Sequence, residues 1–148
     1  MEGVQKMRTE TWLKIAAGVV LLWVSMEDIK CKKVCLYKLC ALVPIGIIQI
    51  LVGAKPSYVQ IGAGLLLGAI VIVLSLATHE KIGLADGLCI AFLGFDFGFT
   101  TVFLIFVLAL VLAACLSTIM LLLKKVELKT AIPFFPFLFL GYVGVMLW

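Results

Sequence analysis

Charged residues are scarce in this chain of 148 residues: aspartate, glutamate, lysine and arginine make up 14% of it, whereas 65% is hydrophobic. A water-soluble domain has about 25% charged and roughly 45 to 50% apolar residues. The chain therefore has too few polar residues to cover a water-facing surface, which excludes a soluble globular domain. The mean hydropathy of +1.29 also excludes an intrinsically disordered chain. We predict an integral membrane protein that forms a single domain over residues 1–148.

Residues that bind metals are equally few. The chain has one histidine, His79, and its five cysteines include no CxxC pair, so neither a zinc site nor a paired redox site is expected. His79 stands beside Glu80 and Lys81, which favours a solvated side chain. We expect free thiols, no metal and no other cofactor. The net charge of +4 is scattered between apolar runs, so we also expect no nucleic-acid partner.

Apolar runs dominate the chain. A helix needs about 20 apolar residues to cross the hydrocarbon core of a bilayer, and these runs are continuous, whereas the strands of a membrane barrel alternate apolar and polar residues. The fourth run is short, so it either extends back through 82–86 or forms a re-entrant element. The sequence predicts an all-α bundle of about six transmembrane helices, over Trp12–Met26, Val34–Gly53, Tyr58–Thr78, Gly87–Phe95, Phe99–Leu123 and Ala131–Trp148.

Lysine and arginine predict the orientation of this bundle, because short cytoplasmic loops carry an excess of both. The loops after the first, third and fifth helices carry more basic residues than the opposite side. They are therefore expected in the cytoplasm, with the N-terminus and the C-terminus outside. The cytoplasmic set is Lys30, Lys32, Lys33, Lys38, Lys81, Lys124, Lys125 and Lys129, and the outer set is Lys6, Arg8, Lys14 and Lys55.

Only three aspartates are present. Asp28 follows the first predicted helix and Asp86 begins the fourth, so both are expected at the cytoplasmic face. Two carboxylates that share a proton can act as general base and general acid toward water, which predicts a hydrolase that needs no metal. The alternative is that both are helix caps, with Asp28 paired to Lys30 or Lys32. Asp96 is expected to be a loop residue near the outer face.

Three stretches resemble landmarks of the type IV prepilin peptidase family. Asp28–Val34 is similar to the aspartate and basic segment that end the family's first core helix. Ile82–Gly87 resembles the GxGD motif, and Ile132–Leu138 resembles the I-P-F-x-P-x-L pattern of the last core helix. The three occur in the family's order and span most of the chain.

The sequence also departs from the family at several positions. Ala85 replaces the second glycine of GxGD, Cys35 and Leu36 stand where the family commonly has Pro-Asn, and Leu88 stands where many members have lysine. Long members carry a cytoplasmic N-methyltransferase region with cysteines, which has no counterpart here. We therefore expect a short form without methyltransferase activity.

The resemblance implies a membrane-embedded aspartyl endopeptidase of a prokaryotic plasma membrane, which removes the leader of prepilin-like proteins at the cytoplasmic face. It implies that Asp28 and Asp86 are catalytic, and we expect Gly83 and Ala85 to bind the extended substrate backbone. The substrate has a short basic leader followed by an apolar helix. No cofactor is implied, and the oligomeric state is open.

Two other functions compete with this one. An inactive accessory or scaffold protein of a pilus or secretion system would suit the departures at Ala85 and Cys35. A small transporter would need ionisable groups near the bilayer centre and an internal repeat, and the sequence shows neither. Pro133 and Pro136 either place the last helix beside the site or simply mark its start.

Overall fold

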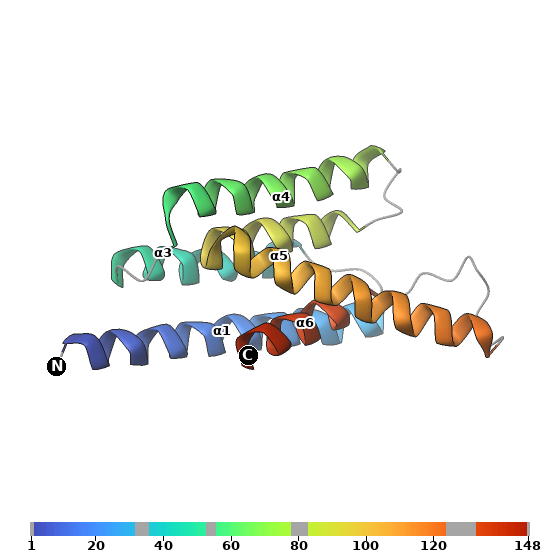
Figure 1. Cartoon of the computed structure of the whole chain (residues 1–148), viewed down its shortest axis with the longest axis horizontal. Coiled ribbons are helices and arrows are strands. Elements are labelled where there is room, and N and C mark those ends of the chain that lie inside the picture. Colours follow the sequence, from blue (N-terminus) through green and yellow to red (C-terminus); the bar gives the residue numbers. More distant parts are fainter. Residues whose placement is uncertain (1, 32–35, 53–55, 78–82, 124–132, 148) are drawn as a thin grey trace.

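The computed structural model describes residues 2–31, 36–52, 56–77, 83–123 and 133–147, and within them all regular structure is helical (Figure 1). The predicted all-α class is therefore confirmed. His79, Ile82, Cys35 and Ile132 lie outside the described residues, as do most lysines of the predicted cytoplasmic loops. The helices are α1 (Glu2–Cys31), α2 (Leu36–Leu39), α3 (Leu42–Val52), α4 (Tyr58–Ala77), α5 (Leu84–Leu122) and α6 (Phe135–Leu147).

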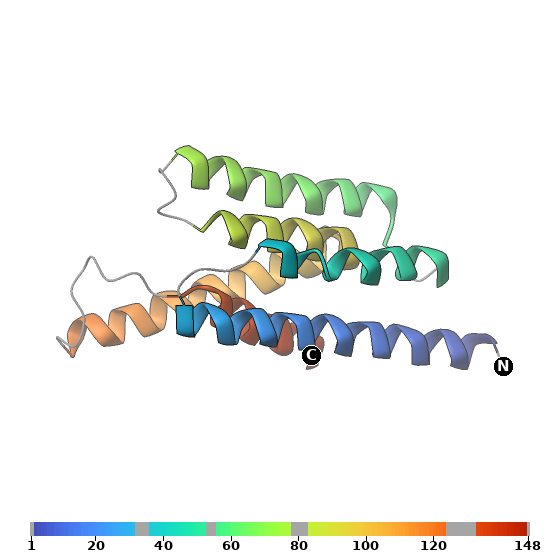
Figure 2. The same ribbon diagram turned by 180° about the vertical axis from the view of Figure 1, so that it is seen from behind.

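The first and last helices pack side by side in opposite directions. The start of α6 meets the end of α1, where the Phe135 N–H donates a hydrogen bond to Asp28. Nearer the end of α6, the Tyr142 hydroxyl donates to the Lys14 carbonyl of α1 over 2.7 Å. Both termini therefore lie toward the end of the bundle opposite Asp28, as Figures 1 and 2 show.

The second predicted segment, Val34–Gly53, does not form one continuous helix. A turn at Cys40 and Ala41 separates α2 from α3, with the Val43 N–H bonded to the Cys40 carbonyl over 3.1 Å. Pro44 explains the break, because it has no N–H to offer the Cys40 carbonyl and its ring clashes with that carbonyl in a regular helix. The chain therefore changes course near the end that carries Asp28.

The fourth and fifth predicted segments meet at Gly98, where the backbone has φ 80° and ψ 171°. A positive φ is accessible to glycine and strained for residues with a Cβ, and a Cβ at this position would lie 2.9 Å from the Pro56 side chain. Both views show the ribbon of α5 turning back at this region, so that 84–97 and 99–122 run in opposite directions. The residues on both sides of Gly98 are helical, as the sequence predicts, and they belong to one kinked element, α5.

Small residues hold α4 against the first half of α5. A Cβ at Gly64 would lie 2.8 Å from the Gly94 Cα, and a Cβ at Gly68 would lie 2.5 Å from the Ala91 Cα. The two backbones are therefore too close for a side chain at either position, as in other small-xxx-small helix pairs. The Gly64–Gly68 pattern therefore serves packing within the bundle. Through this contact α4 supports the helix that carries Asp86.

The close contact of α4 with α5 at Gly68 predicts that two alanine variants of α4 differ in their free energy of unfolding. We expect Gly68→Ala to lower the free energy of unfolding by about 1–3 kcal/mol, because its methyl group must push α4 away from the backbone of Ala91. Gly62→Ala is the matched control, since no atom lies within 4 Å of its added Cβ. Unfolding of both variants in mixed detergent micelles checks the prediction, and equal stabilities would contradict it.

Two of the described helices, α4 and α5, are long and apolar enough to cross a membrane by length and composition. The outward faces of the bundle are apolar as well. Trp23 on α1 is 63% exposed, Val59 and Val73 on α4 are 81% and 62% exposed, and Ile119 on α5 is 52% exposed. Large apolar side chains spread in this way over several helices are typical of a lipid-facing surface.

Candidate functional site

Asp28 lies in the last turn of α1 but is not exposed to solvent. Its side chain is only 8% exposed, and its Oδ2 accepts a hydrogen bond from the backbone N–H of Phe135 over 3.3 Å. Burial raises the pKa of Asp28, and the bond from Phe135 lowers it in part. If Asp28 were a helix cap at the membrane interface, paired with Lys30, its side chain would be solvated. The burial of Asp28 does not support this alternative. Lys32, the other lysine considered as a partner, lies outside the described residues.

The start of α6 explains why an N–H group is free to bind Asp28. The first N–H groups of a helix have no partner within the helix. Here the Phe134 carbonyl accepts bonds from the N–H groups of Phe137 and Leu138, while Pro136 has no N–H. Phe135 therefore supplies the one donor of the first turn that is directed at Asp28. The interpretation that the prolines place the last helix beside the site agrees with this arrangement, and they also mark the helix start.

Asp86 lies in the first turn of α5, which Gly83 precedes. Its backbone N–H bonds the Gly83 carbonyl over 3.0 Å, and its side chain is 8% exposed. A Cβ at residue 83 would lie 2.8 Å from Asp86 Oδ2. The backbone of Gly83 has φ −61° and ψ 124°, which any residue adopts. A side chain at residue 83 would therefore displace the Asp86 carboxylate, although the backbone conformation itself suits any residue.

The fold brings the two aspartates to the same end of the bundle, from helices that are separated by more than 50 residues of sequence. Figure 1 shows the end of α1 and the starts of α5 and α6 at this end. The Asp28 and Asp86 carboxylates are close enough to interact electrostatically. Two partly desolvated carboxylates that repel each other favour the state in which one of them carries a proton. The arrangement can therefore present one proton donor and one proton acceptor at the same end of the bundle.

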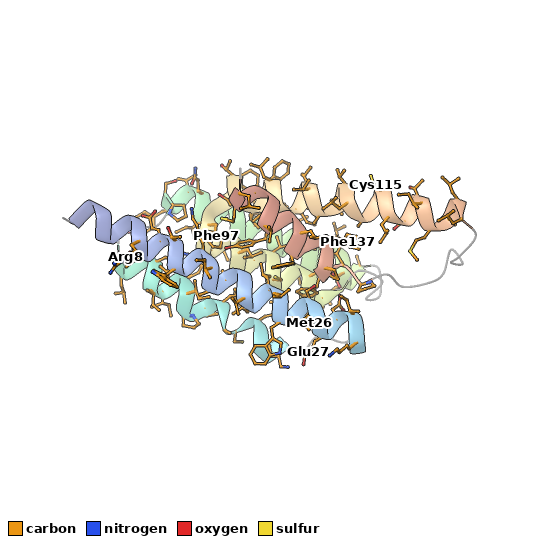
Figure 3. All side chains as sticks on the ribbon, turned by 90° about the horizontal axis from the view of Figure 1, so that it is seen from below. Arg8, Met26, Glu27, Phe97, Cys115 and Phe137 are labelled. Carbon is orange, nitrogen blue, oxygen red and sulfur yellow. The ribbon has the colours of Figure 1, made fainter. Side chains whose placement is uncertain are left out.

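A second acidic side chain of α1 accompanies this pair. Glu27 forms an ion pair with Lys38 of α2, and the Lys38 Nζ lies 5.2 Å from the centre of the Trp23 ring. Figure 3 shows Glu27 and Met26 together near this end of α1. This ion pair could not be predicted from the sequence, because its partners are eleven residues apart and separated by the end of α1. The pair fixes α2 against α1 next to the two aspartates.

Gly83 and Ala85, the two residues expected to bind the substrate backbone, differ in their surroundings. Gly83 is exposed, whereas Ala85 is half-buried and packs against the apolar core. Both positions lie within one helical turn of Asp86. The alternative that Asp86 stabilises the positive end of α5 also fits its place in the first turn, so position alone does not separate the two roles.

The prediction for Asp96 is wrong. It is not a loop residue but part of α5, two residues before the turn at Gly98, and its side chain is 1% exposed. The predicted break between helices does exist, but the chain remains helical through Phe97. Within the described part of the chain, neither carboxylate oxygen of Asp96 has a hydrogen-bond partner. Its Oδ1 and the ring of the neighbouring Phe95 both lie against Gly46 of α3.

No protein-family model, curated protein or solved structure matches this chain.

Proposed function

We propose that the chain is a membrane-embedded aspartyl endopeptidase with Asp28 and Asp86 as its catalytic pair. The observation that supports this most directly is that two buried carboxylates from separate helices interact at one end of an apolar bundle. Ionisable groups are expensive in such surroundings and are usually functional. The resemblance of the flanking motifs to type IV prepilin peptidases points to the same two residues.

The pair would hydrolyse a peptide bond with one shared proton. The ionised carboxylate takes a proton from water as the water oxygen attacks the carbonyl carbon of the substrate. The protonated carboxyl gives its proton to the departing amide nitrogen as the C–N bond breaks. The products are a free carboxyl group and a free amine. The roles of base and acid belong to the pair, and the hydrogen bond from Phe135 holds Asp28 in place for either role.

The proposal places the bundle across the plasma membrane of a prokaryote, with six membrane segments and both termini outside. The turn at Gly98 supports this count, because it divides α5 into two antiparallel parts. The apolar outward faces of α1, α4 and α5 support the membrane location. The end that carries Asp28 and Asp86 would then meet the cytoplasm.

The substrate proposed is a prepilin-like protein with a short basic leader and an apolar helix. Its scissile bond would reach the site where that helix leaves the membrane. Gly83 and Ala85 would lie beside the extended backbone of the substrate, and the exposure of Gly83 supports access from the cytoplasmic side.

Cleavage of such a substrate by the full chain tests the proposal. We expect co-expression of the wild-type chain with a prepilin-like substrate to give a product shortened by its leader, and N-terminal sequencing to place the cut between the basic leader and the apolar helix. An uncleavable control substrate has its leader separated from the apolar helix by an inserted polar segment. If wild-type chain of normal detergent-extracted yield cleaves none of several substrates, the accessory or scaffold function is favoured instead.

A further inference from the structure

Asp96 is the most deeply buried carboxyl side chain among the described residues, with 1% of its surface exposed, and the proposed peptidase chemistry does not use it. It lies ten residues after Asp86 on α5, about 15 Å along the helix axis at 1.5 Å per residue. Figure 3 shows its neighbour Phe97 well away from Glu27, which marks the end with the aspartate pair. Asp96 is therefore separate from the proposed catalytic site, and its role is independent of that site.

The surroundings of Asp96 are tight and apolar. A Cβ at Gly46 of α3 would collide with Asp96 Oδ1 and lie 2.6 Å from the Phe95 ring. The absence of a side chain at residue 46 thus creates the space in which the carboxyl group lies, where α3 packs against α5. Phe97 on the other side of Asp96 packs on Tyr142 of α6, with ring centres 5.7 Å apart.

The titratable groups around Asp96 do not pair with it. The Tyr142 hydroxyl of α6 donates to the Lys14 carbonyl instead. Cys89 is buried on the same helix two turns earlier, and α3 has no titratable side chain along Leu42–Val52. Tyr58, the titratable residue of α4, is 76% exposed. Among the described residues, neither oxygen of the Asp96 carboxyl group has a hydrogen-bond partner.

The donor set limits what this carboxyl group can bind. A metal cation such as Ca²⁺ or Mg²⁺ needs about six oxygen ligands. Among the described residues no three His, Cys, Asp or Glu side chains gather closely enough to hold a metal ion. A proton needs only one oxygen, and it converts a costly buried anion into a neutral group that can pack on glycine and aromatic rings.

We propose that Asp96 is a proton-binding site inside the bundle, at which a protonated carboxyl group packs against Gly46 and joins α3 to α5. Loss of the proton would leave an anion without a partner in this contact. The packing of α3 on α5 therefore depends on the proton.

Infrared difference spectroscopy of the full chain in lipid vesicles tests the proposal directly. The spectrum of the wild type minus that of Asp96→Asn is expected to show, at neutral pH, the carbonyl stretch of one protonated carboxyl group, which shifts in D₂O. Asp28 and Asp86 are present in both proteins and cancel. An ionised carboxylate band in its place would overturn the proposal.

A chemical probe gives an independent measurement. Dicyclohexylcarbodiimide is apolar and reacts with protonated carboxyl groups, so we expect it to label the Asp96 peptide at neutral pH more than a water-soluble carbodiimide does. Labelling should fall by about tenfold per pH unit once the site loses its proton. Protection by sodium ions at constant pH would contradict a proton site and favour a metal cation.

Two glycine variants control for folding and position. Gly46→Ala places a methyl group where Asp96 Oδ1 lies, so the carboxyl group must leave its apolar position and the pH dependence of labelling should shift toward that of an exposed aspartate. Gly62→Ala, with open space around its added methyl group, should label as the wild type does. Identical labelling of all three proteins at every pH would overturn the proposal.

Discussion

Asp28→Asn and Asp86→Asn are each expected to reduce leader removal by about 10³-fold or more, because an amide can neither take a proton from water nor give one to the leaving nitrogen. Each substitution keeps the shape of the side chain, and the amide oxygen introduced at position 28 would still accept the hydrogen bond from Phe135. The folded structure should therefore survive. Rates of leader cleavage by equal amounts of purified chain, read from the shift in substrate size, check the expectation.

The matched control removes a carboxylate from the same helix far from the site. Glu10 precedes Asp28 by 18 residues on α1, about 27 Å along the axis, and Glu10→Gln should cleave at the wild-type rate. The double variant Asp28→Asn/Asp86→Asn should be no slower than either single one, since residues that act as a unit are not additive. Cleavage that survives either single substitution would show that the wrong carboxylates were chosen.

The elements of this fold could be predicted from the sequence to a large extent, because continuous apolar runs and their interruptions are local properties. The helix Tyr58–Ala77 agrees with the predicted segment Tyr58–Thr78 over all its described residues. The break at Cys40 was not predicted, although Pro44 carries the signal: a proline inside an apolar run removes one helical hydrogen bond.

The contacts within the candidate site could be predicted less well from local sequence patterns. The two aspartates could be singled out because so few carboxylates are present, and their common depth followed from the expected helix ends. The contact of Phe135 with Asp28 joins residues 107 apart in the sequence, and no local pattern carries that information. The ion pair of Glu27 with Lys38 was missed for the same reason, since it depends on how α2 lies against α1.

For Asp96 the sequence predicts the nearby helix break correctly but predicts the wrong surroundings for the side chain. The sequence places it next to a helix break, and breaks are usually at the surface. The structure places the break at Gly98, beside Pro56 and Gln60, and leaves Asp96 inside the bundle. A buried carboxyl group is one of the features that a transporter would need, but among the described residues no three His, Cys, Asp or Glu side chains gather closely enough to hold a metal ion.

Gly83→Ala is expected to lower the rate of leader removal by about 10²-fold, because a displacement of roughly 1 Å in a reacting group can cost that much. The added methyl carbon would lie 2.8 Å from Asp86 Oδ2 and 3.3 Å from its Cγ. The carboxylate lies at the end of a side chain, so it can rotate away at little cost to the fold. The backbone at residue 83 already has a conformation that alanine adopts. We therefore expect Gly83→Ala to lower the cleavage rate and to leave the thermal stability close to that of the wild type, when both are measured on the same preparations.

This contrast between cleavage rate and thermal stability distinguishes the two roles open to Asp86. If Asp86 only stabilises the start of α5, then moving its carboxylate should change the melting temperature and leave cleavage intact. If it is half of a catalytic pair with Asp28, the rate should fall while the melting temperature stays close to that of the wild type. Gly62→Ala carries the same substitution into open space on α4 and should change neither quantity. A Gly83→Ala chain that cleaves at the wild-type rate would show that the position of the Asp86 carboxylate does not matter for the reaction, and would thus remove Asp86 from the catalytic pair.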